Sequence, residues 1–286
     1  MDYAVIMTRV YEFNQNAGKP LINLAYANGF PPQTYQYALK PLFDDYRVVS
    51  IHARPLWGDC PPESLTNWEQ LGDDLLTGLE QFTAEPVIGI GHSVGGVATI
   101  YAAIKRPDRF RALILIEPTL LAPHRLLALR LLHGGRREAR HPLIEGALRR
   151  RRSWDSTEAA YEYFKGKKLF ARWPDAVIRS YAESLAPGED GKVYLTWSPE
   201  WEAQIFRTLA TRVWQLPGKL KPPTLLIHGE ISDTFTQGSV VAFRLSNPRA
   251  AIATIKGAGH LVPQEQPEQV GMLIRDFVKR QGTSIS

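Results

Sequence analysis

Short apolar runs alternate with amphipathic stretches along most of this chain. Six of the runs are rich in branched aliphatic residues and are bounded by Gly, Pro, Asn or Asp, as buried strands are. They lie at residues 20–26, 46–51, 86–91, 110–116, 223–229 and 250–255. Apolar residues at helical spacing predict helices at about 33–45, 66–82, 93–105, 238–246 and 267–278, and residues 3–14 predict a strand or hairpin. Strands that alternate with helices form βαβ units, so we expect an α/β fold with a mostly parallel, doubly wound sheet.

The alternation stops between residues 119 and 215. This stretch has no strong strand pattern, and its amphipathic segments predict helices. They cover about 125–133, 156–166, 174–184 and 199–214. We therefore expect a core made of residues 1–118 and 216–286, with a helical cap at 119–215 inserted between two strands of the sheet. Many of the aromatic residues in the cap should pack it onto the core.

The most informative stretch joins the third of the six strands to the next helix. It reads Gly91-His92-Ser93-Val94-Gly95, which has the form Gly-x-Ser-x-Gly. A strand that turns at once into a helix needs a sharp elbow, and glycines two residues before and after the serine keep side chains out of it. Ser93 is then held in a strained turn with its hydroxyl exposed to a ligand.

A serine nucleophile needs a base within hydrogen-bond reach, and the base needs an acidic group that orients it. The carboxyl ends of parallel strands meet at one edge of the sheet. At this edge we expect His260 as the base, after a Gly-Ala-Gly turn, and Asp233 as the acid. The order Ser93, Asp233, His260 is the one expected after a nucleophile elbow. Glu117, at the end of another strand, is the alternative acid.

Two backbone amides should stabilise the oxyanion of a tetrahedral intermediate. The N–H of Val94 follows the nucleophile at the helix start, and the N–H of Phe30 lies in the loop Asn28-Gly29-Phe30 after the first strand. Three residues that follow strands at the same edge are candidates for the substrate pocket, namely Asn28, Trp57 and Glu117.

These motifs resemble the α/β-hydrolase superfamily, in its capped serine-hydrolase branch related to bacterial esterases and carbon–carbon bond hydrolases. The resemblance covers nearly the whole core and rests on three segments. They are the elbow Gly91–Gly96, the acid loop Gly229–Asp233 and the turn Gly257–His260. It implies an α/β-hydrolase fold with a cap where residues 119–215 stand. The chain departs from the family by having Asn28 where His usually precedes Gly, and His52 where an aspartate usually stands two residues before the arginine, here Arg54.

The composition of the chain argues against several other classes of protein. The chain has 286 residues, of which 44% are hydrophobic and 22% charged, as in ordinary globular proteins. It has no apolar run of about 18 residues that would cross a membrane, and its N-terminus does not read as a signal peptide. Cys60 is the sole cysteine, which excludes an internal disulfide and a thiolate metal site. These features fit a cytoplasmic protein.

Positive charge is concentrated in the expected cap. Residues 119–215 hold 17 of the 34 Lys and Arg residues but 11 of the 29 Asp and Glu residues, and the densest run is Arg149–Arg152. Such a run is more often a solvated helix end than a site for an anionic partner, and no nucleic-acid motif accompanies it.

The leading hypothesis is a serine hydrolase that cleaves a carboxylic ester of a small or medium, partly apolar molecule through an acyl-enzyme. It needs no metal and no organic cofactor. The same triad also serves carbon–carbon bond hydrolysis and acyl transfer, and these remain alternatives because the pocket decides among them. A non-catalytic ligand receptor on the same fold is the alternative from another class.

Overall fold

A seven-stranded, mostly parallel sheet forms the centre of the molecule. The computed structural model describes residues 10–58, 60–127 and 142–282. The strand order is β1-β3-β2-β4-β5-β9-β10, and β1 alone runs antiparallel to its neighbour in this sheet. The strands are β1 (Val10–Glu12), β2 (Leu21–Ala25), β3 (Arg47–Ile51), β4 (Val87–His92), β5 (Phe110–Ile116), β9 (Thr224–Gly229) and β10 (Ala251–Ile255). All six strands expected from the apolar runs are confirmed. Of the strand or hairpin expected at 3–14, the part before residue 10 lies outside the described residues.

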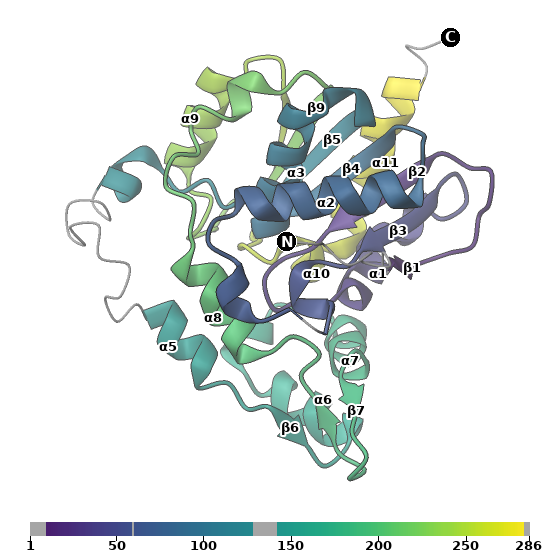
Figure 1. Cartoon of the computed structure of the whole chain (residues 1–286), viewed down its shortest axis with the longest axis vertical. Helices are drawn as coiled ribbons and strands as arrows, with labels where there is room; N and C mark the ends of the chain where they lie inside the picture. The colour runs from purple at the N-terminus through teal and green to yellow at the C-terminus, as the bar shows by residue number, and fades with distance from the viewer. Residues whose placement is uncertain (1–9, 59, 128–141, 283–286) are drawn as a thin grey trace.

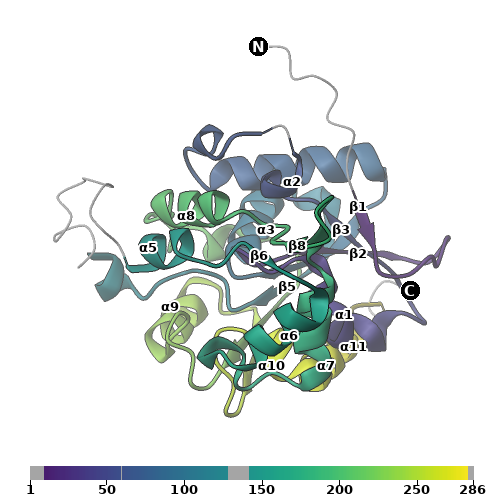
Figure 2. The same cartoon turned by 90° about the horizontal axis from the view of Figure 1, so that it is seen from below.

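Helices cover both faces of this sheet (Figure 1). Figure 2 shows α2 (Glu69–Phe82) and α3 (Val94–Lys105) on one side, with α1 (Gln36–Leu39) and α11 (Pro267–Gly282) on the other. Two further helices are α9 (Gln237–Ser246) and α10 (Val262–Glu265). The doubly wound arrangement is therefore confirmed.

The helix expected at 33–45 is broken into short pieces. The segment forms a 3₁₀ turn at Pro32–Tyr35, the single turn α1, and a second 3₁₀ turn at Lys40–Leu42. Pro41 lacks an N–H and its ring clashes with the preceding helical turn, so it prevents one continuous α-helix.

We define the insertion as residues 119–215, and its residues 153–195 lie at the lower end of the molecule in Figure 1. Residues 123–127 of the insertion are helical, and its further helices within the described residues are α5 (Pro142–Leu148), α6 (Thr157–Lys165), α7 (Asp175–Glu183) and α8 (Pro199–Arg207). The expected helix at 199–214 is thus shorter than predicted, and most of the one expected at 125–133 lies outside the described residues. A small antiparallel sheet of β6 (Ser153–Trp154), β8 (Val193–Tyr194) and β7 (Ala186–Pro187) was not predicted, because two-residue strands are too short to show an alternating pattern.

The insertion packs in two different ways. Aromatic and aliphatic side chains of residues 154–185 form their own buried cluster, in which Phe164 and Tyr181 are 3% and 2% exposed. By contrast, Trp201 and Ile205 of α8 belong to the large cluster that surrounds the central sheet. The division into a core and a separate cap remains a prediction, since α8 shares the core of the sheet domain.

Candidate active site

Ser93 stands at the sharp turn between β4 and α3. Its backbone angles are φ 56° and ψ −121°, which are strained for a residue with a side chain. The neighbouring glycines make this turn possible. A Cβ on Gly95 would lie 2.2 Å from the carbonyl oxygen of Ala25, and one on Gly91 would lie 2.6 Å from Gly96 Cα. The Gly-x-Ser-x-Gly pattern therefore has a steric cause in this chain.

Three side chains from three strand ends form a hydrogen-bonded row. The hydroxyl of Ser93 lies 3.0 Å from Nε2 of His260, and Nδ1 of His260 lies 3.0 Å from Oε2 of Glu117. Since a carboxylate can only accept, the proton of the neutral imidazole resides on Nδ1, and Nε2 is left to accept from Ser93. The serine and histidine predicted from the sequence are thus brought into contact.

Glu117 is fully buried and held from several sides. Its Oε1 accepts the backbone N–H of Gly229 at 2.7 Å, and its Oε2 accepts the hydroxyl of Ser232 as well as the imidazole N–H. The residue has a φ of 47°, an unusual conformation for a glutamate. Strained backbone of this kind collects at functional sites, and here it directs the carboxylate toward His260.

The expected contact between Asp233 and His260 is not made. Asp233 is exposed, and its carboxylate accepts a hydrogen bond from the hydroxyl of the adjacent Thr234. The loop after β9 turns Ser232, rather than Asp233, toward the site. Because β5 is the direct neighbour of β4 in the sheet, Glu117 reaches the position for which we expected Asp233. The alternative acid is therefore the one that the geometry supports.

His92 links two loops of the site. Its Nδ1 accepts the hydroxyl proton of Tyr35 at 2.7 Å, and its Nε2–H donates to the backbone carbonyl of His260 at 3.0 Å. The Tyr35 oxygen in turn accepts the N–H of Ala27, in the loop after β2. Burial lowers the pKa of His92 to about 3, and the nearby His260 contributes to this shift. The ring is consequently neutral and suited to accept on one side and donate on the other.

The two expected oxyanion donors differ in their environment. Val94 is the first residue of α3, and an amide at this position has no partner within the helix. The amide of Phe30 donates to the carbonyl of Ala27 at 3.2 Å, which closes a turn in the loop after β2. An oxyanion would have to share the Phe30 hydrogen with this turn, so Val94 is the better placed of the two.

The insertion holds the loop that contains Phe30. Arg150 pairs with Glu202 and donates to the hydroxyl of Tyr181 at 2.6 Å, and this hydroxyl donates to the carbonyl of Gly29 at 3.1 Å. The amide group of Asn28 donates to the carbonyl of Glu202 at 3.1 Å. Gly29 has a φ of +80°, a conformation that glycine adopts without strain. The side chain of Tyr181 in α7 and the backbone carbonyl of Glu202 in α8 therefore stabilise the loop.

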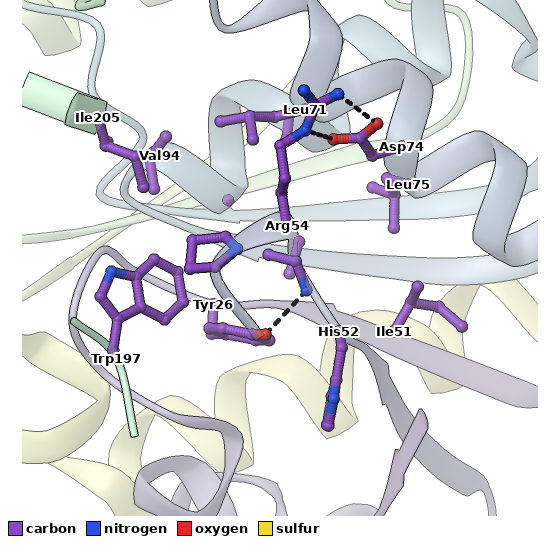
Figure 3. A pocket seen from close by; sticks show the side chains of 15 residues that line it. Tyr26, Ile51, His52, Arg54, Leu71, Asp74, Leu75, Val94, Trp197 and Ile205 are labelled. Carbon is purple, nitrogen blue, oxygen red and sulfur yellow. Dashed lines mark hydrogen bonds and ion pairs between the residues drawn. The ribbon is translucent and has the colours of Figure 1, made fainter. Parts of the chain in front are cut away.

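A pocket lies beside the first turn of α3 (Figure 3). Its cavity volume is about 40 Å³, and it opens to solvent. Its walls are mostly apolar and include Tyr26, Leu71, Val94, Trp197 and Ile205. At one end Arg54 forms two hydrogen bonds of 2.8 Å with Asp74.

None of the three residues expected in the pocket lines it. Asn28 bonds to α8, Glu117 contacts His260, and the indole of Trp57 donates to the carbonyl of His52. The sequence placed these residues at the correct edge of the sheet. The direction of each side chain depends on contacts across the chain, which the local pattern does not contain.

The basic run Arg149–Arg152 is balanced by neighbouring groups of the insertion. Arg149 pairs with Glu145, Arg150 with Glu202 and Arg152 with Glu200, while Arg151 lies over the ring of Trp154. Arg149 and Arg152 are exposed, as expected of a solvated helix end, whereas Arg150 is mostly buried in its network with Glu202 and Tyr181. No helix within the described ranges is long and apolar enough to cross a membrane, and no cluster of His, Cys, Asp and Glu within them could hold a metal ion.

Sequence reasoning missed two groups that touch the site. Thr119 places its hydroxyl 3.1 Å from that of Ser93, and Ser232 bonds to Glu117. Thr119 is two residues beyond Glu117 at the end of the same strand, so its position at the sheet edge was a usable signal. Ser232 has no such signal, because a hydroxyl beside Asp233 in a loop is typical of an ordinary turn.

Comparison with known proteins agrees with this fold. Residues 26–271 match the model of the Alpha/beta hydrolase family, and the chain belongs to this family. It is 22% identical over 285 residues to the uncharacterized hydrolase YugF of Bacillus subtilis, covering 94% of this chain and 93% of that protein. It is 25% identical over 276 residues to the strigolactone esterase D14 of Arabidopsis thaliana, covering 92% and 94%. The crystal structure of E-2-(acetamidomethylene)succinate hydrolase superposes with a TM-score of 0.75 at 21% identity, covering 94% of both chains.

Proposed function

We propose that this protein is a serine hydrolase of carboxylic esters, with Ser93 as nucleophile, His260 as base and Glu117 as the acid that orients the base. The observation that carries the proposal is the unbroken row of hydrogen bonds from Ser93 through His260 to Glu117, with both distances at 3.0 Å. The printed name of a relative that matches over most of the chain, an esterase, agrees with it.

The reaction proceeds in two halves. Ser93 Oγ attacks the ester carbonyl while its proton passes to Nε2 of His260, and the resulting imidazolium is stabilised by the buried carboxylate of Glu117. The tetrahedral oxyanion accepts the N–H of Val94. Collapse expels the alcohol, which takes the proton from His260, and leaves an acyl group on Ser93. Water, deprotonated by His260, then attacks this acyl group, and the acid product and free Ser93 are released.

The apolar pocket beside Val94 suits the acyl group of such a substrate. It starts at the helix turn that carries the oxyanion donor, so a chain extending from the reacting carbonyl can enter it. Apolar walls with few polar groups are typical of small-molecule sites. Carbon–carbon bond hydrolysis and acyl transfer use the same triad and differ in the substrate and the acceptor, so they are tested with the same variants.

The experiment is labelling with a fluorophosphonate probe, followed by peptide mapping, beside hydrolysis of short-chain p-nitrophenyl esters. The expected result is phosphonylation of Ser93 together with ester turnover. Both are lost in Ser93→Ala, and both fall sharply in His260→Ala. Ser239 is a buried serine of α9 outside this site, and Ser239→Ala is the matched control that keeps both activities.

Two results would contradict the proposal. One is a label on a different residue with Ser93 unmodified. The other is a folded protein that reacts with the probe at Ser93 but turns over no ester, thioester or carbon–carbon substrate. The second result would support the ligand-receptor alternative.

A further inference from the structure

Thr119 contacts the atom of Ser93 that makes and breaks bonds in the proposed reaction. Its Oγ1 lies 3.1 Å from Ser93 Oγ, and its backbone N–H donates to the carbonyl of Ser93 at 3.2 Å. Thr119 is half-buried, and its β-branched side chain has few rotamers. The two contacts together hold the Thr119 hydroxyl at a fixed place beside the nucleophile. The steps proposed for Ser93, His260 and Glu117 do not involve this hydroxyl.

The direction of the hydrogen bond between Thr119 and Ser93 follows from the protons that are available. Nδ1–H of His260 donates to Glu117, so Nε2 has only a lone pair, which accepts the hydroxyl proton of Ser93. Ser93 has no second proton to donate. The Thr119 hydroxyl is therefore the donor, and Ser93 Oγ is the acceptor.

The strength of this hydrogen bond changes along the reaction because the charge on Ser93 Oγ changes. In the acyl-enzyme, Oγ is the bridging oxygen of an ester and a weak acceptor, since its lone pair is delocalised into the carbonyl. After water has attacked the acyl carbon, the C–Oγ bond breaks. Its electron pair stays on Oγ, which takes a proton from Nε2 of His260. A hydrogen bond to an oxygen with negative charge is about twice as strong as one to a neutral oxygen. The bond from Thr119 is therefore stronger in the transition state for acyl release than in the acyl-enzyme, and such an interaction accelerates the step.

We infer that Thr119 is a catalytic residue for release of the acyl group, and that its hydroxyl stabilises the negative charge on Ser93 Oγ as the C–Oγ bond breaks. The first half of the reaction gains less, because the hydroxyl of Ser93 already accepts the same bond in the resting protein. The inference rests on the proposed ester hydrolysis and deepens it. It assigns a donor to the departing Oγ in addition to the imidazolium of His260.

The test is hydrolysis of p-nitrophenyl butanoate by Thr119→Val, which keeps the shape of the side chain without its hydroxyl. Acylation is fast with this good leaving group, so kcat reports release of the butanoyl group and kcat/KM reports acylation. We expect kcat to fall about tenfold and kcat/KM to change by less than about threefold, so that KM falls with kcat. The intact mass of protein quenched during turnover should show a larger fraction that carries the butanoyl group.

The fluorophosphonate probe examines the attack by Ser93 alone, because the phosphonate stays on the serine. Its rate of labelling should change by less than about threefold in Thr119→Val. Thr119→Ser keeps the hydroxyl and should restore kcat to within about threefold of the wild type. Thr119→Ala, which also has no hydroxyl, should show the same loss of kcat as Thr119→Val.

Thr224→Val is the matched control. The hydroxyl of Thr224 donates to the carbonyl of Pro222, and the residue is buried at the start of β9, at the opposite end of the sheet strands from Ser93. Removing this hydroxyl also breaks one buried hydrogen bond, but it touches no reacting atom. Both kcat and kcat/KM should equal those of the wild type.

Three results would overturn the inference. They are an unchanged kcat in Thr119→Val, equal falls of kcat and kcat/KM in that variant, and a Thr119→Ser variant that is as slow as Thr119→Val. Failure of the proposed function has a different sign, because the wild type then forms no acyl-enzyme and hydrolyses no ester. In that case the inference falls together with the proposed function, whereas the three results above leave ester hydrolysis by Ser93 intact.

Discussion

His92 donates a hydrogen bond from Nε2 to the backbone carbonyl of His260, over 3.0 Å. His92, which is next to Ser93 in the sequence, thus positions the loop of the proposed base, 168 residues away. Because the other nitrogen of His92 accepts from Tyr35, protonation of the ring would break one of the two bonds.

The free energy of unfolding should therefore decrease below neutral pH because His92 must stay neutral in the folded protein. Its folded pKa is about 3, lowered mainly by burial, against 6.5 in the unfolded chain. As the pH falls, His92 takes up a proton in the unfolded chain before it does so in the folded protein. Its contribution to the free energy of unfolding is therefore complete above about pH 6.5 and is lost as the pH falls toward 3. By pH 5 the loss should be about 2 kcal/mol. Urea denaturation at pH 7 and pH 5 measures it.

His92→Gln is the comparison for this measurement, since a glutamine does not titrate. All other groups are shared, so the difference in pH dependence between the two proteins reports His92 alone. Equal slopes of unfolding free energy against pH in both proteins would show that His92 does not carry this effect.

The assignment of the acid predicts a clear contrast. Glu117→Gln should lower kcat/KM for an ester by about 1,000- to 10,000-fold. The amide N–H can donate to Nδ1 of His260, which favours the tautomer that cannot accept the Ser93 proton, and a neutral amide does not stabilise the imidazolium. Asp233→Asn should change it by less than about threefold, since the Asp233 side chain is exposed and its carboxylate accepts from the hydroxyl of the adjacent Thr234 and makes no bond to His260. Steady-state kinetics, with circular dichroism to verify folding, decides between the two carboxylates. A larger loss in Asp233→Asn would restore the acid expected from the sequence order.

Arg150 is predicted to support the loop after β2. Arg150→Met keeps the aliphatic stem but leaves Glu202, 14% exposed, without its partner, and removes the bond that orients Tyr181. We expect a loss of about 2–3 kcal/mol in unfolding free energy and about a tenfold fall in kcat. Arg149→Met is the control, because the Arg149 side chain is 72% exposed and pairs only across one helical turn. Equal losses of stability and kcat in the two variants would mean that the positive charge of Arg149–Arg152 is responsible, and that the hydrogen bonds of Arg150 to Glu202 and Tyr181 are not.

The elbow glycine offers a steric test. Gly95→Ala would place a Cβ 2.2 Å from the carbonyl of Ala25, and both atoms belong to rigid elements. The variant should lose more than about 3 kcal/mol of stability or fail to fold. Gly146→Ala, in the middle of α5, meets nothing within 4 Å and should be neutral or stabilised by up to about 1 kcal/mol. Thermal melting of the two variants gives the comparison, and a well-folded, fully stable Gly95→Ala would refute the steric account.

Much of the sheet was predictable from local patterns. Buried parallel strands require continuous apolar runs, and the six runs identified in the sequence became six strands of the sheet. Ser93 and His260 were found because the elbow and the Gly-Ala-Gly turn have strict backbone requirements that short motifs record. Failures occurred where local pattern and tertiary context compete, as at Pro41, which divides one expected helix, and in the two-residue strands of the insertion.

The sequence alone determined the alternation of strands and helices and pointed to Ser93 and His260, because these features depend on residues close together in the chain. Only the tertiary structure favours Glu117 over Asp233 as the proposed acid. Both stand at strand ends on the same edge, and the choice depends on the loop conformation that turns Ser232 inward and on the left-handed backbone of Glu117. The pocket likewise depends on the packing of Trp197, just before α8, against Tyr26, a contact between residues far apart in the chain. Such contacts are set by packing of the whole core, which no local stretch of sequence contains.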